Sequence, residues 1–171
     1  RNFADCFDEE DNTRIERIIW NYTELLAKRQ HEIMNEEIYH PVHYGEAQDI
    51  LNTSQFILDE CEELKKKCPA NKMASFISLV YYPACGTANL MKLWIISGRN
   101  KLYAKQNRVE ANELADMLPQ IEAFDEAQIR EYMEIDDGYF WERPRSARMW
   151  RERWTDANPN ASLPRIVGCD A

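Results

Sequence analysis

A polar segment between Arg99 and Asn112 holds the side chains whose types could form a binding site. It follows the longest apolar run of the chain, yet it is rich in guanidinium, amide and phenol groups, which form hydrogen bonds. These groups either line one wall of a ligand pocket or bond across a helix junction. We favour the junction, because buried amides are normally satisfied by neighbouring groups. The candidate ligand or domain-contact residues are Arg99, Asn100, Tyr103, Gln106, Arg108 and Asn112.

The histidines His40 and His43 are of the type that binds metal, but they do not complete a ligand set. They lie three positions apart in an expected connector, with no third ligand nearby. Zinc sites use three or four protein ligands. The chain also has no Gly-rich phosphate loop and no HExxH motif. We interpret the pair as part of a packed loop and predict neither a metal nor a cofactor.

Carboxylates are the most abundant groups that could act as acid or base, since the chain has 30 Asp and Glu residues. Adjacent pairs such as Glu36–Glu37 and Glu62–Glu63 are typical of solvated faces. A catalytic pair could still come from positions far apart in the sequence. Because no motif places such a pair, we predict no catalytic residue in this chain.

The composition argues against nucleic-acid and membrane partners. The 171-residue chain has a formal net charge of -9, which disfavours binding to nucleic acid and to anionic lipid. No run reaches the roughly 18 apolar residues that a membrane span needs. The five cysteines form no CxxC motif, which predicts free thiols. Because the sequence begins with Arg1 rather than Met, we expect a processed product, an excised domain or a fragment.

Arginines and tryptophans alternate near the end of the sequence, in the segment RPRSARMWRERW from Arg143 to Trp154. Arginine beside aromatic residues can bind nucleic acid. The acidic remainder of the chain favours a peripheral helix instead, in which Trp packs and Arg stays solvated. The same face could dock another domain or a sugar ring.

Hydrophobic periodicity predicts the helices that would position the polar segment. Apolar residues recur at spacings of three and four, which places them on one stripe of each helix. We therefore expect an all-α fold, a helical bundle of about five helices at 13–34, 46–67, 71–98, 99–118 and 126–134. An acidic flexible arm (1–12) precedes the bundle domain (13–144), and a short peripheral helix with an irregular tail (145–171) follows it.

The expected third helix is apolar almost all round, which is typical of the central helix of a bundle. Pro83 falls inside it and removes one backbone hydrogen bond. Gly98 is expected to end it in the left-handed conformation. Small residues would let a neighbouring helix approach closely; they are Ala84, Gly86, Thr87 and Ala88.

The stretch from Leu79 to Ala115 also carries a motif. Its members are Leu79, Tyr82, Pro83, Asn89, Leu93, Trp94, Gly98, Asn100, Leu102, Tyr103, Ala104, Gln106, Arg108, Ala111, Asn112 and Ala115. This motif resembles the helical domain that follows the catalytic barrel in glycoside hydrolase family 115, the xylan α-glucuronidases. The segment 43–47 is similar to a family helix start, and 138–144 (GYFWERP) to a family element that adds Tyr139 and Trp141 to the candidate residues. The similarity covers about residues 14–144.

The resemblance implies an accessory bundle domain of an enzyme that removes 4-O-methyl-glucuronic acid from xylan with inversion. The family's catalytic carboxylates lie on its barrel, which is absent here, so the barrel of the same parent chain or complex would be the partner. Xylan-derived carbohydrate would be a further ligand. Family members are often secreted or periplasmic. A stretch that the family has after the position of Tyr132 is missing in this sequence.

Two functions are compatible with these observations. The first is an accessory domain of an α-glucuronidase-like hydrolase, inactive by itself and presenting an apolar or Trp-rich face to a partner domain. The second is a stand-alone binding or scaffolding bundle that shares ancestry with that domain and has a closed polar surface.

Overall fold

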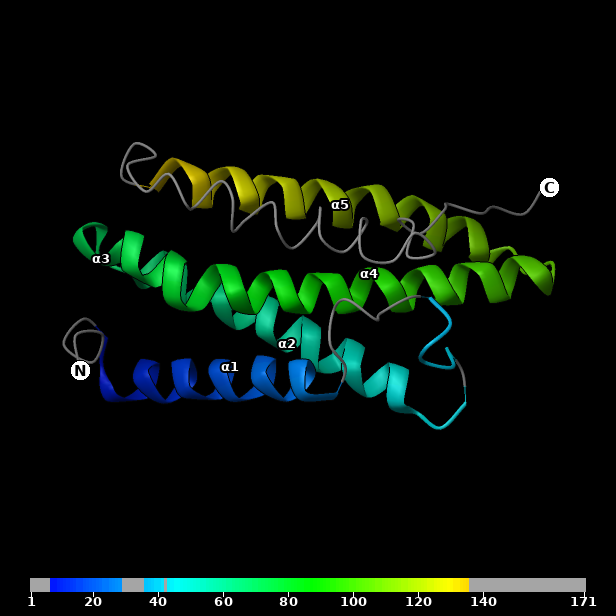
Figure 1. The fold of residues 1–171 in the computed structure, drawn as a ribbon, viewed down its shortest axis with the longest axis horizontal. Helices are drawn as coiled ribbons and strands as arrows, with labels where there is room; N and C mark the ends of the chain where they lie inside the picture. Colours follow the sequence, from blue (N-terminus) through cyan, green and yellow to red (C-terminus); the bar gives the residue numbers. More distant parts are fainter. Residues whose placement is uncertain (1–6, 29–35, 42, 136–171) are drawn as a thin grey trace.

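The computed structural model describes residues 7–28, 36–41 and 43–135, and in this part of the chain every regular element is helical. The all-α prediction is confirmed, but the bundle has four helical rods rather than five (Figure 1). The third rod joins a short helix, a π-helical turn and a long helix without interruption. The elements are α1 (Glu9–Lys28), α2 (Glu46–Lys67), α3 (Ala70–Phe76), η2 (Ile77–Tyr81), α4 (Tyr82–Lys105) and α5 (Glu110–Glu134).

Two predicted helix ends are wrong, and this explains the lower number of rods. The expected break at Pro119 does not occur, because α5 continues through it while Leu118 and Ile121 on either side stay buried. Gly98 does not end a helix either, since α4 runs on to Lys105. The left-handed residue of this turn is Asn107, with a φ of 55°, a conformation that asparagine tolerates better than most residues.

The first helix begins earlier than the sequence predicts. Residues 9–12 were expected in a flexible arm, but α1 starts at Glu9, and Asp8 accepts a hydrogen bond from the backbone N–H of Asp11 at 2.8 Å. Asp11 is buried and forms ion pairs with Lys67 at 2.8 Å and Arg14 at 3.0 Å. The hydrogen bond from Lys67 is the main cause that lowers the pKa of Asp11. Asp11, at the start of α1, therefore helps to join α1 to the end of α2.

The centre of the bundle is α4, as predicted. It contacts α5 on one side and α1 and α2 on the other (Figure 1). Trp94 is 1% exposed and is the largest of its fully buried side chains. Burial of such side chains from several rods removes a large apolar area from water, which is the main force that holds the bundle together.

The start of the third rod adapts to Pro83. As expected, the proline lies inside a helical segment, in the first turn of α4. Just before it, Tyr82 donates its backbone N–H to the carbonyl of Ile77, five residues back, which defines the wide turn η2. Thr87 donates its hydroxyl to the carbonyl of Pro83 at 2.8 Å. The rod therefore continues past the missing donor, and Tyr81 stays in the core.

None of the described helices is long and apolar enough to cross a membrane.

Candidate functional site

The polar segment that the sequence singles out lies at the junction of α4 and α5. Asn100 is fully buried and donates its amide N–H to the carbonyl of Ala111 at 2.7 Å. Gln106 donates its backbone N–H to the carbonyls of Leu102 and Tyr103, both at 3.1 Å, where α4 ends. Asn112 follows in the first turn of α5 and is half-buried. The Asn100 bond joins α4 to the start of α5 as the junction interpretation predicts, whereas the Gln106 bonds stay within the end of α4.

Arg99 points away from this junction, toward the connector that precedes α2. We call the described residues 36–41 of that connector the strap. The guanidinium of Arg99 donates to the carbonyl of Pro41 at 3.1 Å and to the side chain of Gln48 at 2.8 Å. Lys101 forms an ion pair with Glu36 of the strap. The basic residues of this segment therefore hold the strap against α4.

Tyr103, which is half-buried, and the exposed Arg108 form a small cluster at the turn. The guanidinium of Arg108 stacks 3.9 Å from the centre of the Tyr103 ring and bonds Glu110 at 2.7 Å. The hydrogen bond from Arg108 lowers the pKa of Glu110. The six candidates thus face different directions and do not converge on one cavity. Tyr139 and Trp141, together with the tail 145–171, lie outside the described residues.

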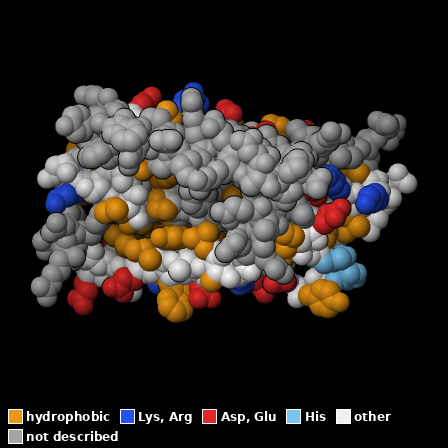
Figure 2. Space-filling model, in the orientation of Figure 1, with side chains coloured by type: hydrophobic (Ala, Val, Ile, Leu, Met, Phe, Trp, Pro, Cys, Tyr) orange, Lys and Arg blue, Asp and Glu red, His pale blue; other side chains and the backbone are white. Residues whose placement is uncertain are grey.

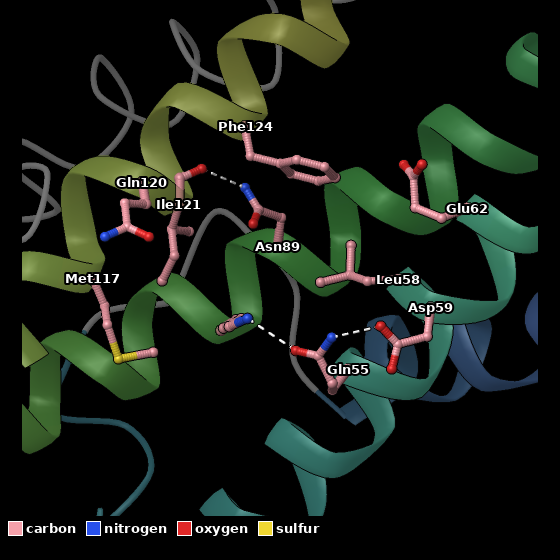
Figure 3. Close-up of a pocket in the computed structure, with 10 residues that line it drawn as sticks. Gln55, Leu58, Asp59, Glu62, Asn89, Met117, Gln120, Ile121 and Phe124 are labelled. Atoms are coloured by element: carbon pink, nitrogen blue, oxygen red, sulfur yellow. Dashed lines mark hydrogen bonds between the residues drawn. The ribbon is translucent and has the colours of Figure 1, made fainter.

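A hollow that the sequence analysis missed lies between α2, α4 and α5 (Figure 3). Its volume is about 310 Å³, within the range of small-ligand pockets. Apolar side chains form part of its wall, among them Leu58, Ile121 and Phe124. The polar residues of the wall are Gln55, Asp59, Glu62, Asn89, Lys92 and Gln120.

Hydrogen bonds orient several of these polar groups. Lys92 donates to the side-chain oxygen of Gln55 at 3.0 Å, and Gln55 donates to Asp59 at 2.8 Å. Asn89 is 4% exposed and donates its amide N–H to the carbonyl of Ile121 at 2.9 Å. This bond fixes the amide, and its oxygen lies on the side of the hollow (Figure 3).

A buried network supports Glu62 from behind the hollow. Tyr81 donates its hydroxyl to Glu62, and Gln128 donates to the same hydroxyl at 2.8 Å. Burial, followed by the hydrogen bond to Glu62, raises the pKa of Tyr81, so it remains a neutral donor. Glu62 is half-buried while Glu63 is exposed. The two therefore do not form the solvated pair that the sequence suggested.

Helical periodicity shows the separate polar stripes that form this hollow, but not that they face one another. Gln55, Asp59 and Glu62 are spaced by four and three residues, so they share one stripe of α2. Asn89 and Lys92 are likewise three apart on α4. Of these residues, the sequence analysis interpreted only Glu62 as part of a solvated face, and it included Asn89 in the family motif.

The histidines of the pair, His40 and His43, are both exposed and contact each other. His43 donates its backbone N–H to the Nδ1 atom of His40 at 2.9 Å, and the rings stack 4.2 Å apart. The two form the pale-blue cluster in Figure 2. In the described part of the chain, no group of three His, Cys, Asp or Glu residues is placed to hold a metal ion.

The described cysteines are buried thiols, as predicted; they are Cys61, Cys68 and Cys85. The hydrogen bond with Cys61 and then burial raise the pKa of Cys85. A thiol with a raised pKa is a weak nucleophile, because only the thiolate attacks. Cys85 is therefore a packing residue of α4, and Cys6 and Cys169 lie outside the described residues.

No protein-family model matches this chain, and no curated protein matches it significantly. The similarity to family 115 therefore depends on the residues of the Leu79–Ala115 motif and its flanks.

Proposed function

We propose that this chain is an accessory helical-bundle domain of an α-glucuronidase-like glycoside hydrolase that acts on glucuronic-acid-substituted xylan. By itself it is not catalytic. Its partner is the catalytic barrel of the same parent chain or complex. The alternative is a stand-alone binding bundle without hydrolase activity, which the hollow between α2, α4 and α5 favours.

The observation that best supports this proposal is that residues of the Leu79–Ala115 motif form contacts between elements of the bundle. Asn89 ties α4 to α5 through the carbonyl of Ile121, and Asn100 does so through the carbonyl of Ala111. Gly98 lies against the strap, since a Cβ added there would be only 2.5 Å from the carbonyl oxygen of Glu36. Several of the residues shared with the family's helical domain therefore help to build this bundle, which supports an architectural role.

The arrangement of carboxylates in the hollow supports the absence of catalysis. Inverting glycosidases place an acid and a base roughly 6.5–9.5 Å apart on opposite sides of the scissile bond. Asp59 and Glu62 come from the same helix three residues apart, so they lie next to each other on one wall. Gln55 donates a hydrogen bond to Asp59 and Tyr81 donates one to Glu62.

Exposed apolar side chains support a partner domain. Trp20 on α1 is 68% exposed and Leu79 in η2 is 62% exposed. In Figure 2, hydrophobic side chains also form a band between α1 and α4. Contiguous apolar surface of this kind is typical of protein interfaces.

The first test is an assay of the chain alone with glucuronoxylan oligosaccharides, with release of 4-O-methyl-glucuronic acid as the readout. We expect no release above that from heat-denatured protein. Release that follows the amount of folded chain would overturn the non-catalytic assignment.

The second test measures binding of the chain to a separately produced family 115 barrel by calorimetry. We expect binding that weakens when Trp20 or Leu79 is replaced by Ala. Lack of binding to any such barrel, together with a monomeric chain in solution, would favour the stand-alone module.

A further inference from the structure

We infer that the hollow between α2, α4 and α5 is a binding site for one neutral sugar ring. Only the identity of the sugar, a xylose unit of the xylan backbone, rests on the proposed function. The chemical class itself comes from the residues of the wall.

The polar part of the wall suits the hydroxyl groups of a sugar. Asp59 and Glu62 offer carboxylate oxygens on one side, and each is already oriented by a hydrogen bond. Asn89 offers its amide oxygen, because its N–H is used by Ile121 and the described residues supply no donor to that oxygen. Lys92 is a donor held in place by Gln55. A ring with several hydroxyls can use acceptors and a donor at once.

The apolar part of the wall suits the C–H face of the same ring. Phe124 points its ring into the hollow, with Leu58 across from it (Figure 3). Aromatic rings present a negative face that attracts the slightly positive hydrogens of a C–H surface. A sugar has both an apolar face and a polar edge, and this hollow offers matching surfaces between adjacent helices.

The charge of the wall selects a neutral ring over an acidic one. The wall has two carboxylates, Asp59 and Glu62, and one ammonium group, Lys92. A uronate would bring a third carboxylate close to the exposed Asp59 and the half-buried Glu62, and like charges repel each other. We therefore expect the backbone xylose rather than its glucuronic acid substituent to occupy the hollow.

The test is a titration of the ¹⁵N-labelled chain with xylotriose, followed by NMR. We expect saturable shifts of the side-chain amide signals of Gln55, Asn89 and Gln120. Glucuronic acid at the same concentrations should leave these signals unchanged. Because the barrel is not in the sample, this result is independent of whether the chain binds a barrel or is inactive alone.

Matched variants locate the site. Phe124→Leu should raise the Kd for xylotriose at least about fivefold, the order expected for loss of one aromatic face. Phe56→Leu, the same change at a half-buried position on α2 outside the hollow, should leave the Kd unchanged. Asp59→Asn should raise the Kd about tenfold through loss of a charged acceptor. Asp49→Asn, on the same helix but away from the hollow, should not.

Three results would overturn the inference. The first is the absence of saturable shifts with xylotriose. The second is equal binding of xylotriose and glucuronic acid. The third is broadening of the same amide signals by a family 115 barrel but not by the sugar, since this would make the hollow part of a protein interface.

Discussion

The two glycines of α4 occupy opposite environments. A Cβ added at Gly86 would meet no atom within 4 Å, whereas one added at Gly98 would lie 2.5 Å from the carbonyl oxygen of Glu36. Gly86 has small neighbours in the sequence, whereas the large residues Trp94 to Ile96 come shortly before Gly98. The sequence alone therefore suggests that another segment approaches α4 closely at Gly86, but in the structure this happens at Gly98. Tight packing along a helix depends on which segment crosses it, and here a connector crosses near its C-terminal half.

The two halves of α4 also differ in how they are held. Around Gly98, side chains reach the strap from Arg99 and Lys101 and reach α5 from Asn100. Around Gly86, Thr87 bonds to Pro83 within the helix, and Asn89 donates to the carbonyl of Ile121 on α5. Both halves of α4 are therefore joined to α5 by a buried asparagine, and the C-terminal half is also bonded to the strap.

Trp94 lies between these halves, and its removal should have the largest effect. Trp94→Ala should lower the free energy of unfolding by about 3–5 kcal/mol, because a fully buried ring leaves a cavity. Urea denaturation measures this loss, and Trp20→Ala is the matched control at an exposed site. An unchanged unfolding midpoint for Trp94→Ala would show that the ring is not in the core.

Asn100→Ala tests the polar bonds of the C-terminal half. It removes a buried donor from the carbonyl of Ala111 and should destabilise the chain by about 1–3 kcal/mol in denaturant unfolding. Asn71→Ala, at an exposed position, should change stability by less than about 0.5 kcal/mol. Equal effects of the two changes would show that the bond from Asn100 to Ala111 does not stabilise the chain.

Gly98→Ala tests the close approach of the strap. Alanine alone favours a helix by about 1 kcal/mol, but the added methyl group overlaps the backbone of Glu36, and such overpacking costs about 1–3 kcal/mol. We expect a net loss of about 1 kcal/mol, together with a shifted amide signal of Glu37 in NMR spectra. A gain in stability would mean that the strap is not held against α4.

Gly86→Ala is the matched change in the other half and should have the smallest effect, of opposite sign. With open space around the new methyl group, it should stabilise the chain by about 0.5–1 kcal/mol, through lower backbone entropy in the unfolded state. Thermal unfolding of both glycine variants measures the difference. A loss here as large as that of Gly98→Ala would remove the contrast between the two glycines.

The sequence predicted the fold class well, because the apolar period of α1, α2 and α4 is strong. It failed at Pro119 and Gly98, because local propensity predicts breaks there while packing of the residues on both sides keeps the helices whole. It identified the junction around Asn100, since polar residues at the end of an apolar helix need partners. The hollow around Asn89 escaped detection because its wall combines stripes from three helices, and one sequence does not say which stripes face each other.

The path of a connector can be set partly by residues of the helix it crosses, as the strap shows. Two of its links to α4 use main-chain groups, the carbonyl of Pro41 with Arg99 and the carbonyl of Glu36 with Gly98. Carbonyls are present whatever the side chain, so these two contacts do not depend on side chains of the strap, whereas the burial of Tyr39 in the core does. The residues that must be kept for this purpose are on α4, including one arginine 58 positions further along the chain.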